Sequence, residues 1–172
     1  KISDSGDFSV IKSLSVNTDG GGARGHLTLA KDGNFYGITC TGGSTGYGTI
    51  FKLTPAGVYT VIHTMVQATE GSNSYASLTE GTDGKLYGTT YSGGMYGFGT
   101  VFKVATDGTL TVLRNLNSAS DGAYPQSDLI QAKNGSFYGT CDGGGQYGNG
   151  TIFKITSGGV FTVVKHLSVS VD

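Results

Sequence analysis

The sequence contains no tryptophan, only two prolines and two cysteines, and few charged residues. Charged residues make up 13% of the 172 positions and the net charge is −1, whereas a nucleic-acid-binding surface needs a basic face. No uninterrupted apolar run approaches the roughly 18 residues of a transmembrane helix. We therefore expect neither a nucleic-acid partner nor a membrane span.

The two cysteines do not predict a disulfide. Cys40 and Cys141 lie about two repeat units apart and one position out of register, since Cys141 is equivalent to Thr39. We expect two small, partly buried free thiols instead.

Glycine is the residue in excess, with 31 occurrences against a usual share of about 7%. A flexible linker is rich in glycine and serine without regularly placed aromatics. Here 10 tyrosines and 8 phenylalanines accompany the glycines at fixed offsets. This pattern indicates tight turns between strands.

One unit of 51 residues repeats through the chain without a gap. Segments that begin at Phe35, Leu86 and Phe137 align directly: FYGITCTGGSTGYGTIFKLTPAG, LYGTTYSGGMYGFGTVFKVATDG and FYGTCDGGGQYGNGTIFKITSGG. The flanking residues follow in the same register. Fixed periods of about 20–50 residues are typical of solenoids and propellers.

Each unit predicts four strands. In the second complete unit they are expected at Ser77–Glu80, Leu86–Tyr91, Thr100–Ala105 and Thr109–Leu116. Asp-Gly pairs mark tight turns, and no window shows helical periodicity over the roughly 10–12 residues that a helix needs.

The predicted fold is all-β, with tandem four-stranded antiparallel blades of a β-propeller. A long polar return from the fourth strand to the next first strand is the connection that a propeller blade requires. Apolar residues on both sides of the third and fourth strands fit sheets covered on both faces. A β-solenoid is the alternative, but its coils are usually shorter and lack four separate turns.

The repeated core resembles the Gloeo/Verruco-type (GloVer) tandem repeat of bacterial secreted and surface proteins. The resemblance rests on the string from Asp83 to Thr90, on Gly93-Gly94, and on Gly99-Thr100-Val101-Phe102-Lys103. It recurs in register over essentially the whole chain; Ile38 and Cys141 depart from the Thr-Thr pair. The resemblance implies an exported, propeller-like protein at the cell surface or outside the cell, and it brings no catalytic residues.

The register predicts a half blade at residues 1–14, with third and fourth strands only, and full blades at 27–65, 78–116 and 129–167. An isolated strand pair is marginally stable and exposes an edge. Because the chain starts at Lys1 without a methionine, we expect a processed, excised or partial segment. Either missing sequence of a longer chain or a second chain would complete the half blade.

The Gly-Gly loops (41–48, 92–99, 143–150) and the long returns (15–26, 66–77, 117–128) are expected on one face. Long loops on a rigid scaffold commonly carry binding residues, and aromatic rings beside polar groups suit sugars or peptides. The alternative is that these side chains pack between blades. The candidate ligand-binding residues are Tyr47, Tyr96, Phe98, Tyr147, Tyr75, Tyr124 and Arg24.

No metal or cofactor site is expected. Asp19, Glu70, Asp121 and Asp172 occupy equivalent positions, but one carboxylate per unit is a poor calcium site and is better explained by a turn. The three histidines, His26, His63 and His166, occupy different repeat positions and are expected at the surface.

The sequence shows no set of nucleophile, base and orienting group, so we expect a protein without enzymatic activity. The primary hypothesis is an extracellular or cell-surface repeat protein with a structural, adhesive or self-assembling role. The alternative is a lectin-like propeller that binds a glycan with one weak site per blade.

Overall fold

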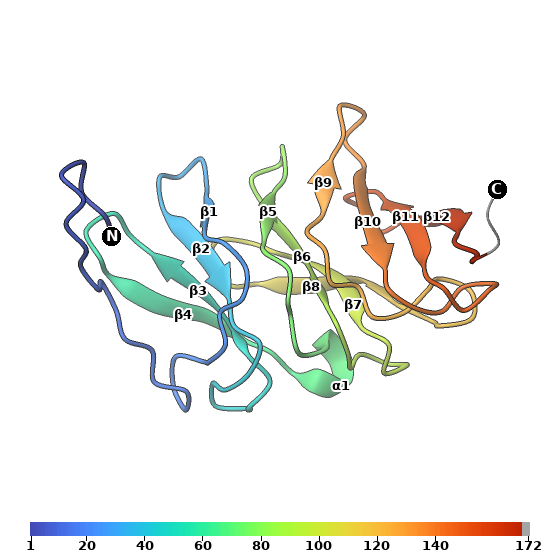
Figure 1. Cartoon of the computed structure of the whole chain (residues 1–172), viewed down its shortest axis with the longest axis horizontal. Helices are drawn as coiled ribbons and strands as arrows, with labels where there is room; N and C mark the ends of the chain where they lie inside the picture. Colours follow the sequence, from blue (N-terminus) through green and yellow to red (C-terminus); the bar gives the residue numbers. More distant parts are fainter. Residues whose placement is uncertain (170–172) are drawn as a thin grey trace.

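The computed structural model describes residues 1–169 and is built from strands, with one short helix. Three sheets of four strands each follow one another along the chain (Figure 1). Sheet 1 comprises β1 (Thr28–Leu29), β2 (Phe35–Ile38), β3 (Thr49–Leu53) and β4 (Tyr59–Thr64). Sheet 2 comprises β5 (Thr79–Glu80), β6 (Leu86–Thr90), β7 (Thr100–Val104) and β8 (Leu110–Asn115). Sheet 3 comprises β9 (Ile130–Gln131), β10 (Phe137–Cys141), β11 (Thr151–Ile155) and β12 (Phe161–His166).

Every sheet has the same topology, because neighbouring strands in the sequence are also neighbours in space and pair antiparallel. In each sheet the pairing of the third and fourth strands contains a register shift at the same repeat position. A solenoid would instead pair equivalent strands of successive units. The all-β prediction and the four-stranded unit are confirmed.

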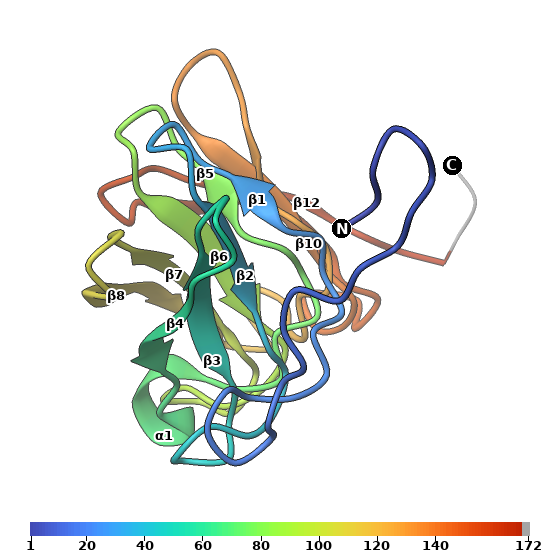
Figure 2. The same ribbon diagram turned by 90° about the vertical axis from the view of Figure 1, so that its left-hand side faces the viewer.

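The sheets stand side by side in an open row, with the N-terminal segment at one end and β12 of sheet 3 at the other (Figures 1 and 2). Within residues 1–169 no sheet closes on itself and the row forms no ring. The return after β4 contains α1 (Gln67–Glu70), a single turn of helix that is too short to produce helical periodicity. No helix in this part of the chain has the length and apolar character of a membrane span.

Residues 1–14, where the sequence predicts the third and fourth strands of a half blade, contain no strand. A single antiparallel bridge joins Ile2 and Phe8, and the hydrogen bonds of residues 1–9 remain within that turn. The physical reason is local, because Asp7 accepts a hydrogen bond from Ser5 and donates its backbone N–H to Ser3 Oγ, which closes a turn in place of two paired strands.

The core consists of two apolar clusters, one at each junction between neighbouring sheets. At the first junction Tyr36 and Ile50 of sheet 1 pack against Leu78, Leu86 and Phe102 of sheet 2. The second junction repeats this arrangement with the residues 51 positions later: Tyr87 and Val101 against Leu129, Phe137 and Phe153. Each sheet therefore has a downstream face, which contacts the following sheet, and an upstream face, which contacts the preceding one.

Hydrogen bonds also recur across both junctions. The hydroxyl of Thr28 donates to the carbonyl of Leu78, and Thr79 donates in the same way to Leu129. The glycine of the repeated Tyr-Gly pair makes room for a ring, since a Cβ on Gly88 would lie 2.7 Å from the Phe102 ring. The repeated residues thus specify both the sheet and the way in which sheets stack.

Candidate functional site

The Gly-Gly loops and the long returns lie on one face of the molecule, as the strand directions predict. Isolated bridges connect the two kinds of loop at equivalent positions: Gly21–Thr41, Ser72–Ser92 and Ala123–Gly143. In Figure 1 this face is the lower one, marked by α1.

On this face the structure brings four predicted ligand-binding residues, Arg24, Tyr75, Phe98 and Tyr124, into one cluster. Tyr91 completes it: the Tyr75 and Tyr91 ring centroids are 5.1 Å apart, and those of Tyr91 and Tyr124 are 5.0 Å apart. The Phe98 ring meets Tyr124 edge-on, and the Arg24 guanidinium lies 4.8 Å from the Tyr75 ring centroid. The Tyr75–Tyr91 contact lies within one unit, whereas the other contacts cross to a neighbouring unit. The cluster therefore packs the loops of neighbouring units together.

The sequence did not single out Tyr91, because its equivalents, Cys40 and Asp142, are not aromatic. The available signal was the variability of this position within an otherwise constant repeat. Cys40 lies at the equivalent junction and donates through Sγ to the carbonyl of Ser74 in the next unit. At both internal junctions the position therefore contacts the following unit, whichever side chain it carries.

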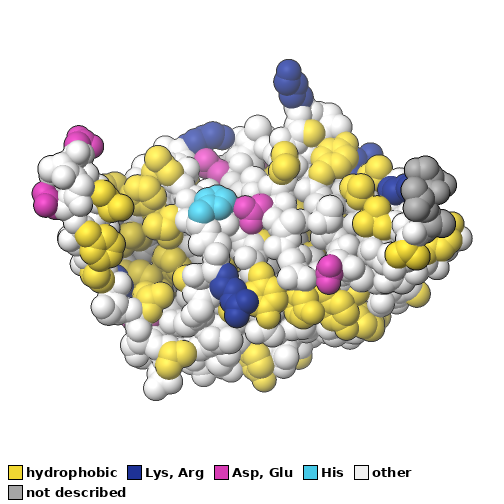
Figure 3. Space-filling view, in the orientation of Figure 1, with side chains coloured by type: hydrophobic (Ala, Val, Ile, Leu, Met, Phe, Trp, Pro, Cys, Tyr) yellow, Lys and Arg dark blue, Asp and Glu magenta, His cyan; other side chains and the backbone are white. Residues whose placement is uncertain are grey.

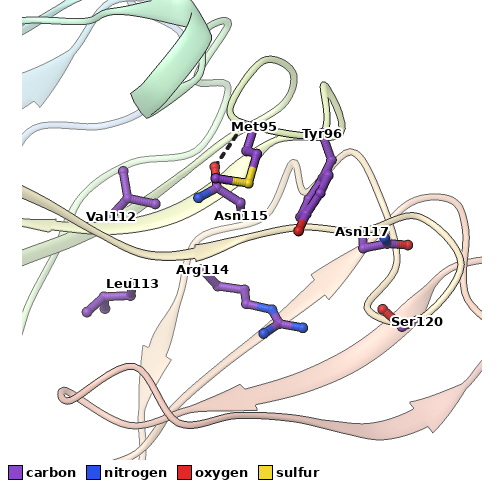
Figure 4. A pocket seen from close by; sticks show the side chains of 8 residues that line it. All are labelled: Met95, Tyr96, Val112, Leu113, Arg114, Asn115, Asn117 and Ser120. Atoms are coloured by element: carbon purple, nitrogen blue, oxygen red, sulfur yellow. Dashed lines mark hydrogen bonds between the residues drawn. The ribbon is translucent and has the colours of Figure 1, made fainter.

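The remaining three predicted residues, Tyr47, Tyr96 and Tyr147, are 40%, 50% and 54% exposed and do not join the cluster. Tyr96 borders an open pocket of about 340 Å³ beside β8 (Figure 4). The pocket is lined by Met95, Tyr96, Val112, Leu113, Arg114, Asn115, Asn117 and Ser120.

The pocket wall is held by hydrogen bonds. Asp121 accepts hydrogen bonds from Nε and Nη2 of Arg114, each at 2.8 Å, and thereby fixes the guanidinium. Asn115 accepts the backbone N–H of Met95 at 2.9 Å, which ties the loop to β8. The pocket therefore presents a fixed cationic and amide rim beside an exposed tyrosine ring.

Asp121 belongs to an arrangement that occurs in three units. The carboxylates of Asp19, Glu70 and Asp121 each accept the backbone N–H of the residue four positions earlier, which supports the predicted turn role. Each carboxylate also contacts a cationic or titratable side chain near the end of the preceding strand, or at the equivalent position of residues 1–14. The three pairs are Lys12–Asp19, His63–Glu70 and Arg114–Asp121. Asp172 lies outside the described residues.

This pairing corrects the expectation that all three histidines lie at the surface. The His63 side chain is only 20% exposed, with Nε2 2.9 Å from Glu70 and Nδ1 3.0 Å from the carbonyl of Gly108. The signal was its repeat position, which Lys12, His63, Arg114 and Lys165 share. The residue type at this position varies, but every side chain found there can carry a positive charge.

Ser77, His26 and Asp128, also equivalent positions, meet where the first strands begin. Ser77 Oγ is 2.7 Å from His26 Nδ1, and Asp128 accepts the backbone N–H of Ser77 at 2.6 Å. Asp128 Oδ2 lies 3.5 Å from the same Nδ1. A catalytic triad uses the two ring nitrogens for the nucleophile and the carboxylate separately, so this arrangement is a polar link between units.

The two cysteines are free, as predicted, but they are fully rather than partly buried. Burial raises the pKa of the Cys141 thiol to about 12, so the reactive thiolate is scarce at neutral pH. Among residues 1–169 no group of three or more His, Cys, Asp or Glu side chains is placed to hold a metal ion.

The outer faces of the first and third sheets carry apolar pockets. On the downstream face of sheet 3 one pocket of about 280 Å³ is lined by Ile130, Tyr138 and Ile152, among others. Beside it, Gln126, Asp142 and Asn149 line a second pocket of about 450 Å³.

The upstream face of sheet 1 is the opposite end of the row. Leu27, Phe35 and Leu53 line a pocket of about 440 Å³ between this face and residues 1–14, to which Ile11 contributes. Hydrophobic side chains gather around a hollow at this N-terminal end in Figure 3. Both ends thus expose the residue positions that are buried at the internal junctions.

The family model of the Gloeobacter/Verrucomicrobia repeat matches residues 1–172, and the chain belongs to this family. No curated protein matches the sequence.

Proposed function

We propose that this member of the Gloeobacter/Verrucomicrobia repeat family is a non-enzymatic structural protein that associates through the ends of its sheet row. In this proposal the sheets are successive blades of a β-propeller, and the protein has a structural or adhesive role outside the cell or at its surface. The resemblance of the repeat to those of secreted and surface proteins supports the exterior location.

The observation that carries the proposal is the exposure of junction residues at both ends. Leu78 and Leu129 are 1% and 2% exposed at the internal junctions, whereas the equivalent Leu27 is 45% exposed. Ile130, equivalent to the junction residues Thr28 and Thr79, is 71% exposed. Leu27 and Ile130 each line a pocket together with other apolar side chains. An exposed apolar patch is typical of an interaction site.

Two substitutions at Ile130 test the association. Ile130→Glu places a charge on the exposed end face and should yield a monomer. Ile130→Thr is the matched control, because it restores the hydroxyl that Thr28 and Thr79 use across the junctions. Size-exclusion chromatography with light scattering should show the wild type and Ile130→Thr above the mass of one chain, 17.6 kDa. Monomeric wild type at every concentration would contradict the proposal.

Carbohydrate binding at the loop face is a second candidate, favoured by the pocket beside Tyr96. An exposed aromatic ring stacks on the apolar face of a sugar, while fixed polar groups bond its hydroxyls. The pocket offers the Tyr96 ring next to Arg114, Asn117 and Ser120 (Figure 4).

A glycan array tests this second function. Tyr96→Ala should abolish binding, whereas Tyr96→Phe keeps the ring and should retain most of it. If the wild type binds no glycan on the array, carbohydrate binding is contradicted as a function.

A further inference from the structure

We propose that the downstream face of sheet 3 docks the segment 22–29 of a second copy of this chain, so that two copies join head to tail. The inference rests on the proposed self-association and adds the partner surface and its register. Segment 22–29 is the part of the first unit that corresponds to residues 73–80 of the second and 124–131 of the third.

The internal junctions define how such a segment is held. Residues 73–80 lie on the downstream face of sheet 1, where Cys40 contacts Ser74 and His26 contacts Ser77. Residues 124–131 lie in the same way on sheet 2, where the Tyr91 and Tyr124 rings stack. The docking site is therefore a continuation of an interface that the molecule already forms twice.

The pockets on sheet 3 coincide with these positions. Gln126 and Asp142 line one of them and are equivalent to Tyr75 and Tyr91. Tyr75 contacts Arg24 of the preceding unit, and Tyr91 stacks on Tyr124 of the following one. Ile130 and Ile152 are equivalent to Thr28 and Ile50 of the first junction. On sheets 1 and 2 the next unit covers these positions, whereas on sheet 3 no residue of the described range 1–169 covers them.

Charge complementarity favours a second copy as the occupant. The open site carries the exposed carboxylate of Asp142, and segment 22–29 carries the exposed cation of Arg24. At the first junction Arg24 lies over Tyr75, its equivalent in the next unit. At a junction between copies, the same register places Gln126 of one copy opposite Arg24 of the other. Asp142, which lines the same pocket as Gln126, then also faces Arg24.

Residues 1–11 must move aside for sheet 3 of one copy to reach the upstream face of sheet 1 of the other. Their hydrogen bonds lie within residues 1–9, and the ion pair that anchors this region to the rest is formed by Lys12 and Asp19. The segment holds no strand, and Phe8 and Val10 remain exposed. Its displacement breaks no pairing between strands.

Two copies would supply six sheets, which lies within the range of about four to eight blades that close a propeller. A head-to-tail contact uses two different surfaces, so it can close into a ring or continue into a filament. We infer the closed pair, with both junctions formed by the same residues.

Charge reversal tests the register without disturbing the core. Within residues 1–169 the hydrogen bond of Asp142 is the one that its backbone N–H donates to the carbonyl of Tyr124, and Arg24 is exposed. Asp142→Arg and Arg24→Asp should therefore both fold. Each variant alone should associate at least tenfold more weakly than the wild type in sedimentation equilibrium. The double variant should recover, because its junctions again pair opposite charges.

The decisive experiment mixes the two single variants. A chain with the Asp142→Arg substitution and a chain with Arg24→Asp should form a mixed pair more tightly than either variant pairs with itself. One junction of that mixed pair keeps the wild-type charges and the other has both charges reversed, so neither brings like charges together. Association of the wild type without any response to these substitutions would overturn the head-to-tail register but leave self-association intact. A monomeric wild type would overturn both proposals.

Discussion

Equivalent carboxylates illustrate at the scale of single residues what the repeat conserves and what it varies. Asp121 accepts hydrogen bonds from Arg114, Ser120 and the backbone N–H of Asn117. The sequence predicts its turn role from the following glycine. It does not reveal the partner cation, because Lys12, His63 and Arg114 differ in chemistry although they occupy one position.

Asp121→Asn should lower the free energy of unfolding at pH 7 by about 2 kcal/mol, since hydrogen bonds to a charged group are lost. Burial alone raises the pKa of Asp121, but the hydrogen bonds from Arg114 and Asn117 outweigh it and hold the pKa below its usual value. Because the pKa of Asp121 is lower in the folded protein than in the unfolded chain, where it is about 3.9, the ionised carboxylate stabilises the fold at pH values above the unfolded pKa. This contribution is lost as the pH falls through the folded pKa.

Urea unfolding at several pH values tests the direction of this pH dependence. The difference between wild type and Asp121→Asn should be largest at neutral pH and shrink below about pH 4. A difference that grows toward acid pH would contradict the assignment.

Two glycines of one loop separate backbone strain from a steric clash. Gly97 and Gly99 both have positive φ, 82° and 94°. A Cβ on Gly97 meets nothing within 4 Å, whereas one on Gly99 would lie 2.1 Å from the carbonyl oxygen of Thr90. Gly97→Ala should cost about 1 kcal/mol, and Gly99→Ala several kcal/mol more. Equal unfolding midpoints of the two variants in urea would refute this interpretation.

At the scale of strands, turn chemistry made most boundaries predictable. The predicted strand Leu86–Tyr91 is observed as Leu86–Thr90, and Thr100–Ala105 as Thr100–Val104. The first strand, predicted at Ser77–Glu80, begins only at Thr79, because Ser77 donates its backbone N–H to Asp128 of the next unit. Contacts between units thus shorten a strand that a single unit would extend.

Equivalent leucines should report the difference between an internal and a terminal junction. Leu78→Ala removes a buried side chain from the first junction and should cost about 2–5 kcal/mol. Leu27→Ala, at the exposed equivalent position, should cost less than about 1 kcal/mol in the monomer and should weaken self-association instead. Thermal unfolding at low protein concentration compares the two, and equal losses would argue against the assignment of faces.

At the scale of the whole molecule, the repeat register predicted three equivalent sheets, and the structure shows them in an open row. Register alone could not show what lies against the outer faces, because each unit has the same two faces regardless of its neighbours. The structure adds the open positions around Ile130 and Asp142 and the incompletely covered face around Leu27. The predicted ligand-binding residues fall into two groups. Tyr75 and Tyr124 pack within the aromatic cluster, whereas Tyr96 remains exposed.

The mass of the wild-type protein in solution tests the central claim most directly. Sedimentation equilibrium over a dilution series should show one reversible transition between a single chain of 17.6 kDa and a pair of twice that mass. The pair should be the largest species at high concentration, because head-to-tail closure uses both ends. A mass of one chain at every concentration would contradict the account.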